Sequence, residues 1–184
     1  MPSTLVKKLG SVGLDKHWHL SATEHEISLT EIEFALFRTF SAFSRWMDDL
    51  ALCSVDEDTN CNGIDFAVLN VIRMHDRPKA LSDIARLLNR DDLSNMQYTL
   101  RKLIKAGLVE KVGSEGQKKG VTYRVTDLGE IATERYAQFR RELLIPMTQA
   151  LAKSEDRMEE VAKVLRLLSG IYDQAACVVA SHRE

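Results

Sequence analysis

The 184-residue sequence has few of the residues that mark specialised classes of protein. It contains three cysteines, three prolines and nine glycines, and 45% of its residues are hydrophobic against 28% charged. These values are close to the averages of soluble globular proteins, which argues against a disulfide scaffold, a disordered chain and a collagen-like repeat. At roughly 150 residues per domain, the length indicates one domain, or a small domain with an extension.

The residues of metal and catalytic sites are also sparse. Cys53, Cys61 and Cys177 form no CxxC pair, so neither a zinc knuckle nor a redox motif is indicated, and free thiols are typical of a cytoplasmic protein. We favour an inert Cys61 over an oxidant-sensing one, because the acidic residues 56–58 precede it. No phosphate-binding Gly-rich loop, GxSxG elbow or catalytic carboxylate pair is present, and we expect no enzyme activity and no cofactor.

The N-terminal histidines provide the one candidate cluster of metal ligands. His17, His19 and His25 lie around Trp18, but other ligands near them are scattered over a terminal arm. We therefore favour surface or packing histidines and expect no metal.

Long apolar runs are absent. The longest stretch without a charged residue, Leu143 to Ala152, has 10 residues, whereas a membrane span needs about 20. Residues 1–16 lack the apolar region of a signal peptide and are interrupted by Lys7, Lys8 and Gly10. We therefore expect neither a membrane span nor a secretory signal.

The charge is nearly balanced in total but uneven along the chain. The formal net charge is −2, from 25 Lys and Arg and 27 Asp and Glu. Residues 73–126 hold 12 basic and 6 acidic residues, a charge of +6, whereas the rest of the chain holds 13 basic and 21 acidic residues, a charge of −8. A basic segment in an acidic frame indicates a surface for a polyanion, although chance variation in surface charge gives the same pattern.

Hydrophobic spacing predicts long helices before this basic segment. Residues 1–20 show little periodicity, and residues 1–23 are expected to form an N-terminal arm. Ser21 followed by Glu24 fits a capping box for the helix that comes next. Residues 24–51 then carry apolar side chains three or four positions apart, as on one face of a helix. After a polar loop over residues 54–63, a second helix is expected over residues 64–75, ending at the turn 76–78. The stripe of the first helix is Leu29, Ile32, Leu36, Phe40, Phe43, Met47 and Leu50.

The next three elements form a winged helix by their order. A short helix is expected over residues 83–88, capped by Ser82, and a second over residues 93–106, closed by Gly107. Two short helices joined by about four residues are the helix-turn-helix pattern. Residues 108–112 and 121–125 predict the two strands of a hairpin. The expected buried residues are Ile84, Leu87 and Leu88 on the first helix, and Leu93, Met96, Leu100, Leu103 and Ile104 on the second.

Two further helices are expected at the C-terminal end. Thr126 is expected to cap a helix from Asp127 that bends at Pro146. A last helix over residues 155–181 has apolar residues close to a heptad spacing. A small winged helix over residues 64–126 cannot cover this apolar surface, so we predict that residues 24–53 and 127–184 form a dimerisation region. An intramolecular bundle is the alternative. The seam is Met158, Val161, Leu165, Leu168, Tyr172, Ala175 and Val178.

Residues 81–129 resemble the winged helix of the MarR (multiple antibiotic resistance regulator) family of transcription factors. The resemblance rests on the helix pair, the wing and two short segments, and the helix order over residues 24–182 is similar too. It implies a mainly α fold with a small β-hairpin wing, in which a winged helix-turn-helix is flanked by long N- and C-terminal dimerisation helices. The two segments are Leu103-Ile104-Lys105-Ala106-Gly107-Leu108-Val109-Glu110-Lys111 and Val125-Thr126-Asp127-Leu128-Gly129.

The wing departs from the family pattern. The family usually carries Asp-x-Arg there, with the Asp holding the Arg for the minor groove, whereas this chain has Gln117-Lys118-Lys119-Gly120. Lys119 lacks the planar fork of an arginine, and Gln117 is no anionic partner. We therefore expect Lys118 and Lys119 to contact DNA phosphates as point charges.

Helical spacing also predicts which residues face DNA. On the second short helix, Arg101 suits a guanine, Gln97 or Asn95 an adenine, and Tyr98 a phosphate or a thymine methyl. A solvated polar face is the alternative interpretation. Residues on or after the preceding helix are expected to contact the DNA backbone. The outward-facing set is Ser94, Asn95, Gln97, Tyr98, Arg101 and Lys105, and the backbone set is Ser82, Arg86 and Arg90.

The resemblance implies a homodimeric regulator that binds double-stranded DNA at a pseudo-palindromic operator. Such proteins usually repress and are released by a small-molecule effector bound between the dimerisation helices and the winged helix. The ligand would favour a wrong spacing of the two DNA-reading heads. Phe43, Trp46 and Tyr136 are candidates to line the pocket, although each taken singly is more typical of a core residue. The alternative function is a protein-interaction module without a specific DNA site.

Overall fold

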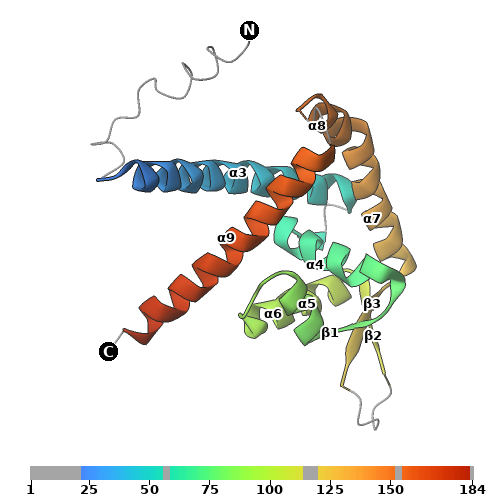
Figure 1. The fold of residues 1–184 in the computed structure, drawn as a ribbon. Coiled ribbons are helices and arrows are strands. Elements are labelled where there is room, and N and C mark those ends of the chain that lie inside the picture. The colour runs from blue at the N-terminus through green and yellow to red at the C-terminus, as the bar shows by residue number, and fades with distance from the viewer. Residues whose placement is uncertain (1–21, 56–58, 114–119, 152–154, 183–184) are drawn as a thin grey trace. The chain divides into compact units, whose positions relative to one another are not determined.

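A computed structural model describes residues 22–55, 59–113, 120–151 and 155–182. These residues are mostly helical, with one small antiparallel sheet, as the sequence predicts (Figure 1). Their contacts divide the chain into two compact units, with the boundary between Thr133 and Glu134. The first unit contains the helix pair and the hairpin, and the second contains the last helices.

The first described helix, α3 (Glu24–Ser54), begins at a capping box two residues later than predicted. The Thr23 Oγ1 accepts a hydrogen bond from the Glu26 amide at 3.2 Å, and the Glu26 carboxylate accepts one from the Thr23 amide at 3.0 Å. The predicted cap at Ser21 and Glu24 is wrong because the same Ser/Thr-x-x-Glu spacing recurs at Thr23. Ser21 and the rest of the predicted arm over residues 1–21, with His17 and His19, lie outside the described residues.

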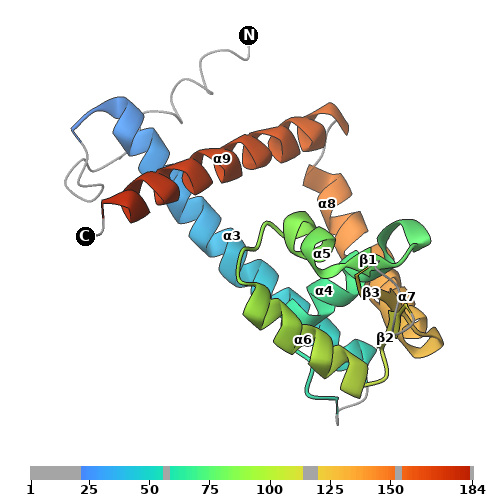
Figure 2. The ribbon, with the colours of Figure 1, turned by 90° about the horizontal axis from the view of Figure 1, so that it is seen from below.

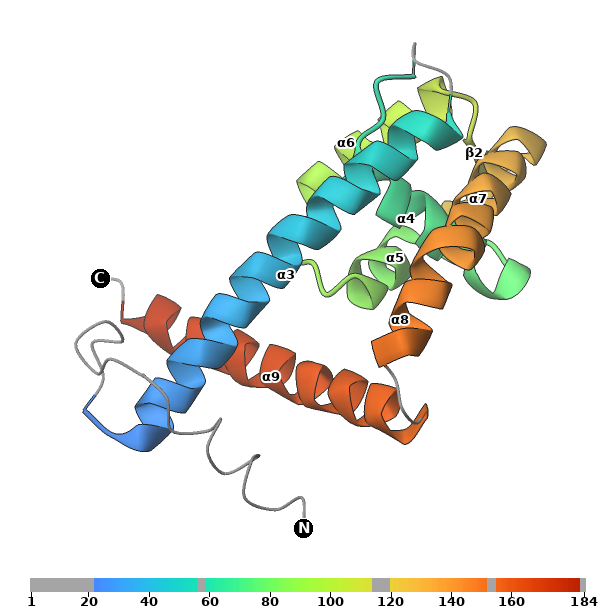
Figure 3. The ribbon, with the colours of Figure 1, turned by 90° about the horizontal axis from the view of Figure 1, so that it is seen from above.

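Helix α4 (Gly63–Arg73) packs against the C-terminal part of α3, which passes over it in Figure 3. The approach is close at Gly63, where a Cβ atom would lie 2.7 Å from the Cβ of Met47. Asn62 and Asp65 form a second capping box at the start of α4. Met47 and Leu50 of α3 and Gly63 at the start of α4 are buried.

Helices α5 (Leu81–Leu87) and α6 (Leu93–Lys105) complete the winged-helix core together with α4 and the sheet (Figure 2). Of the side chains predicted to be buried, Ile84, Met96, Leu100 and Leu103 are at most 1% exposed. The largest fully buried side chains of the chain lie in this core. They are Phe66, Leu69, Ile72, Ile84, Met96, Leu100, Leu103 and Leu108.

Three local predictions for this helix pair are wrong. Helix α5 starts at Leu81 with Ala80 as its cap residue, so Ser82 is an exposed residue of the first turn and not the cap. Leu87 is 52% exposed, because the small Ala85 takes the buried position beside Ile84. On α6, Leu93 at the first position is 46% exposed, and Thr99 is buried instead.

The sheet has three strands in the order β1-β3-β2, all antiparallel. The hairpin strands β2 (Val109–Val112) and β3 (Thr122–Val125) were predicted, whereas β1 (Lys79–Ala80) was not. Lys79 is only 4% exposed, and its Nζ donates to the carbonyls of Ile72 at 2.8 Å, Met74 and Arg77. Burial lowers the pKa of this ammonium group. Lys79 thereby satisfies carbonyls at the end of α4 and in the short 3-10 helix η2 (Met74–Asp76) that follows it.

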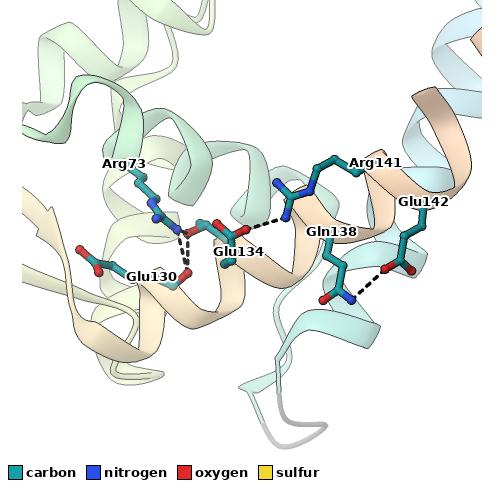
Figure 4. Close-up of polar contacts among 7 residues, drawn as sticks. Arg73, Glu130, Glu134, Gln138, Arg141 and Glu142 are labelled. Carbon is teal, nitrogen blue, oxygen red and sulfur yellow. Dashed lines mark hydrogen bonds and ion pairs between the residues drawn. The ribbon is translucent and has the colours of Figure 1, made fainter. Parts of the chain in front are cut away.

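Helix α7 (Asp127–Phe139) is capped by Thr126 as predicted, since the Thr126 Oγ1 accepts a hydrogen bond from the Gly129 amide at 3.1 Å. A Cβ atom on Gly129 would lie 2.1 Å from the Leu108 carbonyl oxygen, so only glycine fits there. The Arg73 guanidinium donates to the Glu130 carbonyl at 2.8 Å and to the Thr133 hydroxyl (Figure 4). These contacts fix the first turns of α7 to the end of α4.

The second unit continues through the π-helix η3 (Arg140–Leu144), α8 (Ile145–Leu151) and α9 (Glu155–Ser181). The π-helix ends two residues before Pro146, where the sequence predicts a bend. Pro146 has no amide hydrogen and its ring disturbs the preceding turn, so an irregular turn at this point has a clear cause. The pairs Arg141–Glu134, at 2.6 Å, and Gln138–Glu142, at 2.9 Å, lie along this stretch (Figure 4).

Helix α9 is exposed along most of its described length, and Ala162 and Leu168 are half-buried. Leu165 and Val161 of the predicted seam are 46% and 50% exposed, and Ile171 is 62% exposed. Among the described helices, Arg157–Ser181 is the one that is long and apolar enough to cross a bilayer, judged by length and composition alone. A dimerisation helix meets the same two criteria, so length and composition alone do not separate the two environments.

Candidate nucleic-acid interface

The outward face of α6 carries the residues that the sequence assigned to DNA. Burial of Met96, Leu100 and Leu103 fixes the rotation of this helix about its own axis. The six predicted residues are therefore all exposed, with Tyr98 at 63%. Their exposure agrees with the prediction, whereas their contacts with bases stay a prediction. They are Ser94, Asn95, Gln97, Tyr98, Arg101 and Lys105.

A single carboxylate organises the N-terminal end of α6. The Arg90 Nε donates to one carboxylate oxygen of Asp92 at 2.8 Å, and the Arg90 Nη2 donates to the other oxygen. The Asn95 amide also donates to Asp92, at 3.0 Å. These donors hold the pKa of the Asp92 carboxyl well below its usual range. Arg90, predicted to contact phosphate, and Asn95, predicted to contact a base, are thus both held by Asp92.

The turn between α5 and α6 is tight. Asn89 has a φ of 52°, in the left-handed region that asparagine tolerates, and the Arg90 amide donates to the Ala85 carbonyl at 2.9 Å. Ser82 and Arg86 are exposed on α5, and Arg86 pairs with Asp83 at 3.0 Å. An exposed pair of this kind contributes little, so a phosphate can compete for Arg86.

A cavity of 390 Å³ lies beside the C-terminal half of α6. Its α6 side includes the predicted residues Tyr98, Arg101 and Lys105, and its other side is the loop before α4. Sequence reasoning missed the two loop residues, Thr59 and Asn60, because nothing in their local pattern indicates that they lie against α6. The remaining lining residues are Lys102 and Ala106.

The wing carries a cross-strand ion pair. Glu110 on β2 and Arg124 on β3 are register partners, and an Arg124 Nη2 lies 2.5 Å from a Glu110 carboxylate oxygen. This pair raises the pKa of Arg124. Lys118 and Lys119 at the tip lie outside the described residues, so their predicted phosphate contacts stay predictions.

Pairing reduces the positive charge that the basic segment presents. Lys79 is buried, Lys102 lies 2.5 Å from the Asp65 carboxylate, and Arg90 is paired with Asp92. In the described part of the chain, neither Arg101 nor Lys105 makes an ion pair. The net charge of +6 on residues 73–126 therefore overstates the positive charge that a polyanion would meet. On the helix pair, the exposed and unpaired positive charge is concentrated near the C-terminal end of α6.

A second cavity, of 550 Å³, lies between α3, α4 and the turn before α6. Most of its lining is apolar, including Phe40, Phe43 and Leu88, and the charged residues among the described lining are Arg90 and Asp48. Phe43 was predicted to line an effector pocket. Trp46 is not among the lining residues, and Tyr136 belongs to the second unit, where the Arg140 guanidinium lies 5.8 Å from its ring centre.

The titratable groups of the described residues form no cluster of three or more His, Cys, Asp or Glu side chains suited to a metal ion. Cys61 is buried, and burial raises the pKa of its thiol, as expected for an inert cysteine. Cys53 and Cys177 are exposed free thiols.

Comparisons with known proteins match this arrangement. Residues 62–129 match the family described as winged helix DNA-binding domain. Among curated proteins, none matches the sequence. Staphylococcus aureus MarR in complex with salicylate and kanamycin is similar in structure, with 18% identity over 82% of this chain and 96% of that one and a TM-score of 0.63.

Two further solved structures have the same fold. Streptococcus pneumoniae FabT in complex with DNA has 17% identity over 80% of this chain and 99% of that one, with a TM-score of 0.60. NMB1585, a MarR family regulator from Neisseria meningitidis, has 13% identity, covers 82% and 96%, and has a TM-score of 0.63. Residues 62–129 therefore match the winged helix DNA-binding domain family, and the chain has the fold of these MarR-type structures.

Proposed function

We propose that this protein is a cytoplasmic regulator of transcription that binds a pseudo-palindromic DNA site as a homodimer. The observation that carries the proposal is the outward face of α6, which is exposed, polar and basic on a helix fixed by a buried face. In helix-turn-helix proteins this second helix enters the major groove. The FabT structure in complex with DNA supports the use of this fold on a duplex.

The residue types on α6 suit base readout. Arg101 presents a planar fork that matches the two acceptors of a guanine, and Gln97 presents the donor and acceptor that an adenine requires. Asn95 offers the same chemistry once its bond to Asp92 is exchanged for one to a base. We propose that Ser82 and Arg86 on α5, together with Lys118 and Lys119 of the wing, contact phosphates and so position the protein on the duplex.

The homodimer is supported by apolar surface that the single chain leaves exposed. Phe37 and Phe40 on α3 are 72% and 69% exposed, and the seam of α9 is exposed as described above. Exposed apolar surface on this scale marks an interaction site. Pairing of two identical subunits buries it symmetrically and presents two α6 helices to a two-fold symmetric site.

A small-molecule effector is proposed to release the DNA, which makes the protein a ligand-responsive repressor. The apolar 550 Å³ cavity is within the usual size range of ligand sites. Arg90 lines this cavity and also pairs with Asp92 at the start of α6, so an anionic ligand there competes with Asp92 for Arg90. Such a ligand disturbs the carboxylate that also holds Asn95.

Salicylate, which is bound in the Staphylococcus aureus MarR structure, is a suitable probe for this cavity. We expect salicylate to raise the melting temperature of the wild type and to weaken its DNA binding. The Ala67→Leu variant places extra side-chain volume in the cavity and should show neither effect. Equal responses of the two proteins would contradict the effector site.

The proposed DNA binding is tested by fluorescence anisotropy with a duplex from the region upstream of the protein's own gene. A dimer that neutralises about 6 to 10 phosphates should lose about 10³ to 10⁵ in affinity between 50 and 200 mM salt. Arg101→Ala should weaken binding to this site by about 1 to 3 kcal/mol. Arg135→Ala, the same change on the exposed face of α7, is the matched control and should bind normally. A wild type without salt-sensitive binding would instead favour the protein-interaction module.

A further inference from the structure

We propose that the 390 Å³ cavity beside α6 is a phosphate-binding site, shared between the recognition helix and the loop before α4. In its DNA-bound form the site rests on the proposed function, since the phosphate then belongs to the DNA backbone. The site adds Thr59 and Asn60 to the interface, two residues outside both the α6 face and the wing.

The α6 side of the cavity supplies the positive charge. Arg101 and Lys105 are four residues apart and therefore lie one above the other on the helix, with Tyr98 a turn earlier. Both basic side chains are exposed, and neither has an ion-pair partner within the described residues. Lys102 also lines the cavity, but its Nζ lies 2.5 Å from the Asp65 carboxylate and forms an ion pair with it. None of the described lining residues is acidic.

The loop side of the cavity is held in place. Cys61 is 6% exposed and anchors the loop in the core, and the Asn62 side chain accepts a hydrogen bond from the Asp65 amide at 3.0 Å. The Gly63 amide donates to the Asp48 carboxylate at 2.7 Å. Asn60 has a φ of 49° and is exposed, so its amide side chain stands at the cavity without a core role.

These groups define a ligand with a compact negative charge. A lysine point charge, an asparagine amide and the Tyr98 hydroxyl are donors that suit the oxygens of a phosphate. The Arg101 guanidinium adds positive charge beside them, and its fork remains available to a guanine. The volume of 390 Å³ is within the range of small-molecule sites and leaves room for a group attached to the phosphate.

Two sources supply this chemistry. A backbone phosphate of the DNA bound by α6 would lock the C-terminal end of that helix on the duplex. The phosphate of a small molecule would occupy the same groups and compete with DNA. The experiment below separates these sources by measuring DNA and pyrophosphate binding on the same proteins.

The DNA arm compares the wild type with Lys105→Met, Asn60→Ala and the control Lys163→Met, an exposed lysine of α9. Lys105→Met removes one phosphate contact from each subunit of the dimer and should therefore reduce the slope of log affinity against log salt by about 1.8. Asn60→Ala should weaken binding by about two- to tenfold with an unchanged slope, because it removes a neutral donor. Lys163→Met should match the wild type in both quantities. The mutated side chains are exposed, and circular dichroism melting curves check that each variant is folded.

The second arm titrates the DNA-free proteins with sodium pyrophosphate at low salt by isothermal calorimetry. Binding that is lost in Lys105→Met, weakened in Asn60→Ala and kept in Lys163→Met supports the site. If pyrophosphate also displaces DNA from the wild type, the phosphate of a small molecule can occupy the site in competition with DNA. When the DNA arm alone shows the expected changes, the source is the DNA backbone.

The outcomes separate this site from the proposed function. A wild type that binds DNA, with normal affinity and slope in Lys105→Met and Asn60→Ala and no pyrophosphate binding, overturns the site and leaves the function standing. A wild type that binds no DNA but binds pyrophosphate through Lys105 and Asn60 overturns the function and leaves the site, with a small molecule as its ligand.

Discussion

The winged helix and the last helix of this chain differ in the burial of their apolar residues. In α6, Met96, Leu100 and Leu103 are at most 1% exposed, whereas Leu165 and Ile171 of α9 are 46% and 62% exposed. Both helices have a regular apolar spacing, so spacing alone does not distinguish them. The winged helix buries the apolar face of α6 within the chain. The apolar face of α9 is left exposed, and we propose that a second copy of the chain covers it.

The largest effect should follow from a leucine-to-alanine change in the first of these regions. Leu100→Ala removes a fully buried side chain and should lower the free energy of unfolding by about 2 to 5 kcal/mol. Leu167→Ala, on α9 and off the predicted seam, removes a side chain that is 61% exposed and should change it by at most about 0.5 kcal/mol. Urea denaturation measures both. Equal losses would show that α9 is packed as tightly as α6.

A glycine-to-alanine pair sharpens the same comparison. Gly129→Ala brings a Cβ atom against the Leu108 carbonyl oxygen and should destabilise the protein by about 1 to 3 kcal/mol. Gly170→Ala on α9 meets nothing within 4 Å and should stabilise the helix by about 0.5 to 1 kcal/mol. Thermal melting should therefore move in opposite directions. A loss of stability in both variants would mean that another chain closely covers Gly170.

The proposed dimer provides the third comparison. Leu165→Glu places a charge on the predicted seam of α9 and should weaken self-association by about 1 to 3 kcal/mol. Gln174→Glu adds the same charge at an exposed position off the seam and should leave it unchanged. Sedimentation at micromolar concentration distinguishes a dimer from the 20.8 kDa monomer. A stable wild-type monomer would contradict the interface assigned to the terminal helices.

The smallest effect concerns acid stability at the start of α6. Because the folded-state pKa of Asp92 is lowered by Arg90 and then by Asn95, its contribution is present above the ordinary value of 3.8 and is lost as the pH falls below it. Asp92→Asn should therefore lower the melting temperature slightly at pH 7, and the difference should shrink towards pH 2. A constant difference across this range would contradict the role of the Asp92 charge.

Sequence reasoning succeeded where a pattern repeats over several turns. The spacing of Met96, Leu100 and Leu103 was enough to place the outward face of α6, because a helix with one buried face has one possible rotation. It failed at helix ends, where Leu87 is the last residue of α5 and Leu93 the first of α6, and both are about half exposed. At these positions the next element decides burial, and a local pattern does not contain that information.

Features built from distant or unexpected residues were also missed. Strand β1 has two residues, too few for an alternating pattern, and Lys79 is a buried lysine because carbonyls from η2 and its neighbours converge on it. Asn60 reaches the α6 cavity only through the packing of α4 on α6. The total charge likewise did not show which basic residues are paired. The pairing becomes visible only from the positions of Asp65 and Asp92 in the fold.

The claim that the outward face of α6 reads DNA is tested most directly by a ratio of affinities. For the wild type and Arg101→Ala, we would measure binding to the upstream duplex and to a scrambled duplex of the same length and composition at one salt concentration. We expect Arg101→Ala to lose about 5- to 150-fold on the upstream duplex and much less on the scrambled one, so that the ratio falls. A ratio that stays at the wild-type value would contradict base readout by α6.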